Sequence, residues 1–159
     1  MAEVECGYTT LGGVDAVALL TTVGPTLAVN VGFDPAWRVG TGDRPAISTQ
    51  VFPALVDTGA YECCIDQILA VQLGLPLVDR KPISGVHGSQ ETNIYLAQLY
   101  IPPFDYTMYG LFAGVGLRAG GQPHHALIGR TFLQHFRLEY EGQTGSAKLI
   151  GPASPPTRP

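Results

Sequence analysis

Hydrophobic and polar residues alternate from residue 26 to 33, which puts four apolar side chains on one face. This alternation predicts a strand with one buried face. A second predicted strand, residues 47–57, ends in three consecutive apolar residues before Asp57, as is typical of a strand buried on both faces. Residues 126–128 repeat that apolar run before Gly129, and a short helix is expected after each run. The two halves are therefore predicted to be related by a pseudo-twofold axis.

Other elements follow from the same patterns. Strands are predicted at residues 19–23, 95–101 and 106–115, and as a hairpin of residues 137–140 and 147–150. Asp66 can cap a helix that ends at Gly74, with apolar residues spaced for burial at Ile68, Leu69, Val71 and Leu73. A short helix is expected over residues 130–136. The polar segment 34–45, with Trp37 as its one large anchor, predicts a surface loop.

Composition supports one predominantly β domain. The chain has 159 residues, of which 45% are hydrophobic, enough for one well-buried core. Only 14% are charged, whereas 20 glycines and 13 prolines favour short strands and turns over long surface helices. We therefore predict an all-β domain over residues 1–150, in which 1–25 form an N-terminal extension or strand. The proline-rich residues 151–159 are predicted to be a disordered tail.

Charge and hydropathy exclude several partners. The net charge is −4 and the basic residues are scattered, so no nucleic acid is expected. The first five residues are acidic where a signal peptide would be basic, and no apolar run reaches the roughly 18 residues of a membrane helix. The expectation is a cytoplasmic protein without membrane insertion.

Asp57-Thr58-Gly59 is the main candidate for chemistry. Desolvation and hydrogen bonds control the pKa of a carboxylate at the end of a buried strand. The Thr58 hydroxyl can donate to nearby backbone, and Gly59 lets main chain or substrate approach closely. A bare Asp-Thr-Gly is a weak signal, because an ordinary Asx or ST turn also fits it.

Three cysteines, Cys6, Cys63 and Cys64, cannot all pair within one chain, and their spacing is not that of a zinc site. We interpret them as reduced thiols. In an extended segment the adjacent Cys63 and Cys64 point to opposite sides, so that one is buried. A nucleophilic role for either is the alternative.

Several other residues also have two readings. His124-His125 could ligate a metal, but adjacent side chains diverge and no third ligand follows at a suitable spacing, which favours a turn. His87 could gain charge as the pH falls or be a solvated side chain. Tyr106 and Tyr109 are interpreted as packing residues, and the glycine-rich residues 114–121 as a hairpin loop, not a phosphate site. No metal or cofactor is expected.

Three motifs in order resemble those of the retropepsin-like aspartic proteases. They are Leu55-Val56-Asp57-Thr58-Gly59-Ala60, the glycine-bearing segment Ile83 to Ser89, and Leu127-Ile128-Gly129-Arg130 before a helix. The resemblance covers residues 27–150 and looks closest to the bacterial branch of the family, where a segment like residues 127–133 is common.

The resemblance implies a closed, retropepsin-like barrel of six or more strands with one or two short helices. Asp57 would be catalytic, at the base of a cleft, with Thr58, Gly59 and Ala60 completing the active-site loop. A flap would cover the cleft and would consist of Ser84, Gly85, Val86, His87 and Gly88. Structural support would come from Leu127, Ile128, Gly129 and Arg130.

Hydrolysis of a peptide bond by this chemistry needs two carboxylates that share one proton. The chain has seven aspartates, and only Asp57 is followed by Thr-Gly or Ser-Gly. One chain therefore supplies half of a dyad, which predicts a homodimer with Asp57 facing Asp57 of the second copy. The substrate would be a peptide or protein in extended conformation.

This sequence departs from the retroviral pattern at Tyr61, where an aspartate usually pairs with the arginine equivalent to Arg130. We expect Arg130 to take another partner, with Glu62 as the candidate. Two other functions stay open: a catalytically silent module that keeps the fold for peptide binding or dimerisation, and a small-ligand barrel.

Overall fold

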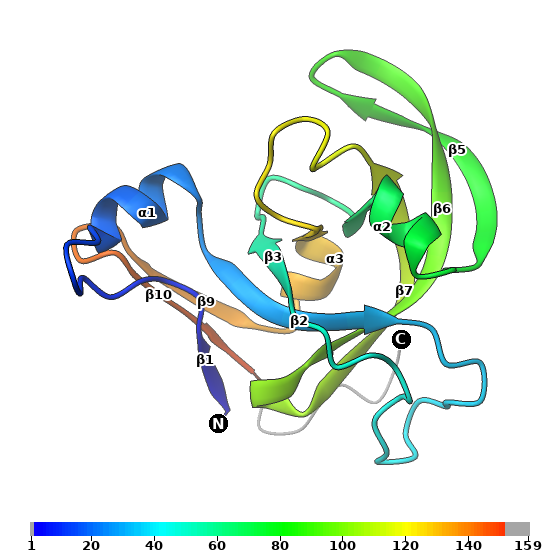
Figure 1. Ribbon diagram of the computed structural model, residues 1–159, viewed down its shortest axis with the longest axis horizontal. Helices are drawn as coiled ribbons and strands as arrows, with labels where there is room; N and C mark the ends of the chain where they lie inside the picture. Colours follow the sequence, from blue (N-terminus) through cyan, green and yellow to red (C-terminus); the bar gives the residue numbers. More distant parts are fainter. Residues whose placement is uncertain (1, 152–159) are drawn as a thin grey trace.

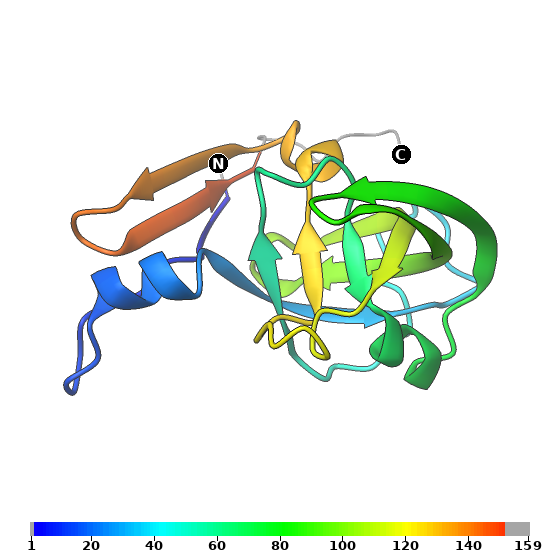
Figure 2. The same cartoon turned by 90° about the horizontal axis from the view of Figure 1, so that it is seen from above.

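The computed structural model describes residues 2–151, which form two sheets and a few short helices (Figures 1 and 2). The predominantly β class predicted from the sequence is confirmed. None of the helices in this range is long and apolar enough to cross a membrane. The predicted tail falls outside the described residues except for Gly151, whose N–H donates to the Ala2 carbonyl at 2.9 Å.

The larger sheet has seven strands in the order β2-β3-β8-β4-β7-β6-β5. β2 also pairs with β6, so strands distant in that order are joined into a ring. Buried apolar side chains from these strands make up most of the core. The strands are β2 (Thr26–Gly32), β3 (Phe52–Val56), β4 (Cys64–Asp66), β5 (Leu77–Gly85), β6 (Gly88–Ile101), β7 (Tyr106–Val115) and β8 (Ala126–Ile128).

The two apolar runs of the sequence lie side by side in this sheet. β3 and β8 pair in parallel, with Ala54 opposite Ala126 and Val56 opposite Ile128. These four side chains share one face and are buried, whereas Leu55 and Leu127 between them are only half-buried. The predicted burial of both faces is therefore incomplete. The weak internal repeat thus corresponds to one parallel strand pair, the second and third strands of the larger sheet.

The smaller sheet joins the two ends of the described chain. β1 (Glu3–Glu5), β10 (Ser146–Ile150) and β9 (Arg137–Glu141) pair in the order β1-β10-β9. Figures 1 and 2 show the β9–β10 hairpin and helix α1 (Ala16–Thr22) projecting from one side of the molecule. The β5–β6 hairpin projects from the opposite side.

The strand predicted at residues 19–23 is wrong, because this segment belongs to α1. Asp15 caps that helix, and its Oδ1 accepts hydrogen bonds from the N–H groups of Val17 and Ala18 at 3.0 and 3.2 Å. The cap satisfies backbone donors at the helix start and thereby outweighs the strand preference of the apolar and β-branched residues that follow.

Two further predictions need correction. Residues 47–51 are not in a strand, since the segment before β3 lacks a partner among the described strands. The helix capped by Asp66 is confirmed as α2 (Gln67–Gln72), but Ile68 and Val71 are 56% and 65% exposed. Leu69 and Ala70 provide its buried face instead. The remaining helices are the short η1 (Pro102–Phe104) and α3 (Arg130–Leu133).

Candidate active site

Asp57 directly follows β3, at the end of the parallel β3–β8 pair. Its N–H donates to the Ile128 carbonyl at 3.0 Å, which fixes the backbone to β8. One carboxylate oxygen, Oδ1, accepts from the Gly59 N–H at 2.9 Å. The side chain is half-buried, so the carboxylate is oriented by the turn and still reaches solvent.

The rest of the predicted active-site loop is open. Thr58 and Gly59 are exposed, and Ala60 is half-buried, with its N–H 3.3 Å from the Asp57 carbonyl. This local geometry is that of a tight turn, which is the ordinary, non-catalytic interpretation of Asp-Thr-Gly. What distinguishes it from an ordinary turn is how closely a distant segment binds the loop.

That segment begins at Gly129, at the start of α3. A Cβ at this position would lie 2.4 Å from the Glu62 carbonyl oxygen and 3.0 Å from that of Ala60, so only glycine fits. The next two N–H groups, of Arg130 and Thr131, donate to the carbonyls of Ala60 and Tyr61 at 2.9 and 3.0 Å. The structure thus brings together the two sequence motifs predicted to form the site.

Arg130 does not pair with Glu62, contrary to our prediction. Its Nη1 donates to the main-chain carbonyl of Thr58 at 2.7 Å. Glu62 instead forms an ion pair with Lys81 of β5 at 2.9 Å, and this hydrogen bond raises the pKa of Lys81. The Thr58 carbonyl thus takes the place of the carboxylate that pairs with this arginine in the retroviral pattern.

Sequence reasoning missed two contacts around this loop. Lys81 was not singled out, although its bond to Glu62 ties the β5–β6 hairpin to the segment after Asp57. The Sγ of buried Cys63 accepts from the Gly129 N–H at 3.3 Å. No pattern in the sequence marks either contact, because each depends on strands brought together by the fold.

The hairpin predicted to act as a flap is present as the turn between β5 and β6. Gly85 pairs with Gly88 at its end, and Val86 at the tip is 99% exposed. Within residues 2–151 the tip makes no hydrogen bond to the Asp57 loop. Figures 1 and 2 show the hairpin rising on one side of the molecule and bending back, so that its tip points toward the rest of the chain.

The cysteines are poor candidates for a nucleophile. Burial raises the pKa of Cys6 to about 11 and that of Cys64 to about 12, and it also raises the pKa of Cys63. All three are free thiols. Cys63 is buried and Cys64 half-buried, in line with the predicted alternation. Thiolate populations near neutral pH are therefore very low.

His124 and His125 lie in the irregular segment before β8. Burial lowers the pKa of both side chains. The Nε2 of His124 hydrogen-bonds the Thr26 hydroxyl at 2.8 Å, while the Nδ1 atoms of both histidines are buried without a protein partner. In the described range no three His, Cys, Asp or Glu side chains are arranged to hold a metal ion.

The site can orient one accessible carboxylate. No second acidic side chain in residues 2–151 is hydrogen-bonded to Asp57, so chemistry that shares a proton between two carboxylates requires a group from another molecule.

Comparisons with known proteins find a likeness among solved structures. No protein-family model matches the chain, and no curated protein matches it. Among solved structures, the chain is similar to the EIAV protease complexed with the inhibitor HBY-793. The two are 19% identical, the likeness covers 69% of this chain and 85% of that chain, and the TM-score is 0.42.

Proposed function

We propose that this protein is a retropepsin-like aspartic endopeptidase that works as a homodimer, with Asp57 of two copies facing each other. One observation carries the proposal. The half-buried Asp57 lies directly after the parallel β3–β8 pair, and the segment that starts at Gly129 binds the loop that follows Asp57. This arrangement joins two of the three motifs on which the family resemblance rests, residues 55–60 and 127–130.

The reaction follows from two carboxylates that share one proton. Like charges a hydrogen bond apart cannot both ionise, so one Asp57 is ionised and the other protonated. The ionised group takes a proton from water, which attacks the scissile carbonyl carbon. The protonated group donates its proton to the carbonyl oxygen, which gives a tetrahedral intermediate with two hydroxyls. The group that took the proton from water then passes it to the amide nitrogen. As the intermediate collapses, the C–N bond breaks, the amine leaves, and one hydroxyl returns its proton to the other carboxylate.

Other residues have supporting roles in this proposal. The Thr58 hydroxyl would bond to backbone across the dimer, and Gly59 would contact the substrate main chain. The tip from Ser84 to Gly88 would close over an extended peptide and pair with it as a strand. The ring of strands would be the closed barrel of the family, and residues 127–133 favour its bacterial branch.

The catalytic assignment is tested by Asp57→Asn. This change keeps an oxygen that can accept from the Gly59 N–H while removing the ionisable group. Both proteins are incubated with a diverse peptide library from about pH 4 to 7, the range expected for a shared-proton pair. Asp79→Asn, at an exposed acid of β5, is the matched control. Cleavage by Asp57→Asn at the wild-type rate would overturn the assignment.

The split dyad is tested by mixing. When wild type and Asp57→Asn are combined in equal amounts and exchange subunits, only about a quarter of the dimers contain two aspartates. Activity per total protein should then fall to about a quarter of that of wild type alone at the same total concentration. A fall to one half would mean that each chain works alone. Absence of cleavage by wild type under every condition would favour the silent peptide-binding module.

A further inference from the structure

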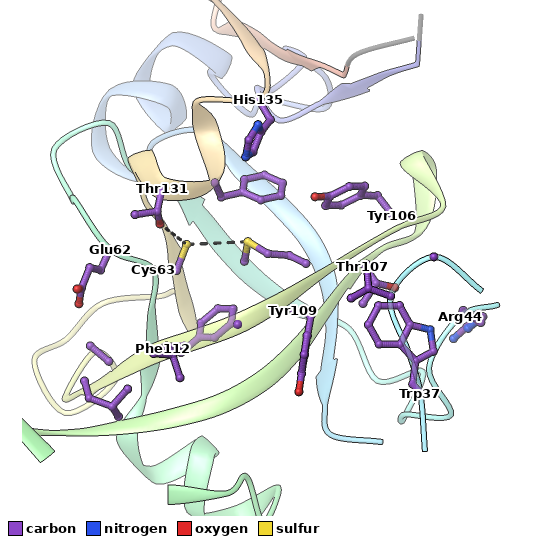
Figure 3. A pocket seen from close by; sticks show the side chains of 18 of the residues that line it. Trp37, Arg44, Glu62, Cys63, Tyr106, Thr107, Tyr109, Phe112, Thr131 and His135 are labelled. Atoms are coloured by element: carbon purple, nitrogen blue, oxygen red, sulfur yellow. Dashed lines mark hydrogen bonds between the residues drawn. The ribbon is translucent and has the colours of Figure 1, made fainter. Parts of the chain in front are cut away.

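A cavity of about 550 Å³ surrounds one edge of β7, away from Asp57. Loop residues from Trp37 to Arg44 line one side, and Cys63, Thr131 and Phe132 line the other. Figure 3 shows Trp37, Tyr109 and Arg44 on one side of the β7 ribbon and Cys63, Thr131 and His135 on the other. We call this cavity the β7 trough.

The edge of β7 inside the trough has no strand partner in the described part of the chain. β6 covers the opposite edge from Tyr106 to Ala113, whereas β4 pairs only with residues 113–115. The Ala113 N–H donates to the Cys63 carbonyl on the β4 side. Because backbone groups alternate along a strand, the N–H groups of Leu111, Tyr109 and Thr107 point to that same edge. They are donors without a strand to receive them.

The trough has two walls because side chains alternate across β7. On one face Tyr109 meets Trp37 edge to face at 5.9 Å between ring centroids. On the other face the Cys63 and Met108 sulfurs are 4.0 Å apart, and Tyr106 packs on Phe132. A strand added along the free edge would place its own side chains alternately against these two apolar walls.

Among the charged residues at the rim, only Asp43 has a side chain without an ion pair, hydrogen bond or cation–π contact in residues 2–151. Lys81 pairs with Glu62, and the Arg44 guanidinium lies 4.5 Å from the centre of the Tyr100 ring. The Tyr100 hydroxyl in turn donates to Asp105 at 2.9 Å. An apolar partner therefore suits the trough better than a charged one.

We propose that the β7 trough binds an extended, uncharged peptide segment that adds a strand to β7 and alternates apolar side chains. Unpaired strand edges bind peptides in this way, with affinity from main-chain hydrogen bonds and selectivity from side-chain pockets. Glu62 and Cys63, which line the trough, lie five and six residues after Asp57. The proposed binding does not depend on the proposed function.

The test uses Trp37, the one tryptophan of the chain, as the reporter. The Asp57→Asn protein is titrated with a capped peptide of about seven residues, the length of the free edge, in which leucine alternates with threonine. The fluorescence emission of Trp37 should change as the peptide is added and should reach a plateau. The same peptide, N-methylated on its central amides, should bind at least tenfold more weakly because it cannot complete the strand pairing.

Two variants localise the binding. Gly110 lines the trough, and a Cβ at this position would meet no atom within 4 Å. The leucine side chain of Gly110→Leu should therefore occupy space in the trough without a clash and weaken peptide binding at least tenfold. Gly116→Leu, at a similarly open glycine outside the trough, should bind like the parent protein. Leu111→Pro removes a free-edge N–H and should also weaken binding. If this proline variant fails to fold, Gly110→Leu alone decides.

Three results would overturn the proposal: no change of Trp37 emission with any such peptide, equal affinity of Gly110→Leu, or equal affinity of the N-methylated peptide. The two proposals fail separately. Cleavage by wild type without trough binding would refute only the trough, and trough binding without Asp57-dependent cleavage would refute only the protease assignment.

Discussion

The Nη1 of Arg130 donates to the main-chain carbonyl of Thr58 at 2.7 Å. The start of α3 is thereby tied to the residue next to Asp57, although the two positions are far apart in the sequence. A cation on a carbonyl oxygen holds the backbone of the loop and does not engage the Asp57 carboxylate.

Arg130→Ala should lower the free energy of unfolding by about 1 kcal/mol, the usual loss for one hydrogen bond of an exposed side chain. It should also reduce peptide cleavage, because the Asp57 loop loses its anchor. Urea unfolding and cleavage assays measure the two effects. Arg137→Ala, at an exposed arginine of β9, controls for charge and should leave cleavage unchanged. Full activity of Arg130→Ala would contradict the anchoring role.

Gly129→Ala should destabilise the protein by at least about 2 kcal/mol. The added Cβ would lie 2.4 Å from the Glu62 carbonyl oxygen. Both atoms belong to or are attached to the main chain, so neither can move without a shift of the backbone. Gly116→Ala, where the nearest atom is at 3.9 Å, should change stability by less than about 0.5 kcal/mol. Thermal or urea unfolding distinguishes the two; similar small effects would mean that the loop adapts.

Stability should fall as the pH drops below about 6.5, the ordinary pKa of histidine. Burial lowers the pKa of His124 in the folded protein, so between the folded and unfolded pKa values the unfolded chain binds more protons. The free energy of unfolding therefore rises with pH through this window. Urea midpoints from about pH 5 to 8 measure the slope, which His124→Asn should reduce. An equal slope in that variant would contradict the prediction.

The thiols of the folded protein should resist alkylation near neutral pH. Burial raises the pKa of Cys6 to about 11 and of Cys64 to about 12, so few thiolates exist at about pH 8. Mass spectrometry after iodoacetamide treatment should show slow labelling of the native protein and rapid labelling in denaturant. Labelling of native Cys64 as fast as in denaturant would contradict the pKa shift.

Much of the fold could be predicted from local patterns. The alternation before Phe33 predicted β2, and the segment from Tyr106 to Val115 was predicted as a strand with the bounds of β7. The apolar runs ending at Val56 and Ile128 predicted β3 and β8. These succeeded because burial of side chains in a sheet imposes a pattern on consecutive residues.

The failures arose where a single polar contact or a distant partner decides the structure. Residues 19–22 have the pattern of a strand but belong to α1, which Asp15 caps. The helix is thus indicated by a single residue and not by a pattern. Arg130 bonds to a carbonyl, which every residue has, so no residue type in the sequence identifies its partner. The free edge of β7 depends on where β4 begins, at Cys64 opposite Ala113, which no local pattern records.

The pairing of β1 with β10 has a consequence for how the chain is made. Glu3 lies opposite Ile150, so the smaller sheet cannot close until nearly all of the described chain has left the ribosome. Contacts between residues so far apart in sequence slow folding, because a large loop must be ordered before they form. During synthesis, residues 3–5 therefore have no partner strand until β10 emerges. Only then can β1 join the smaller sheet.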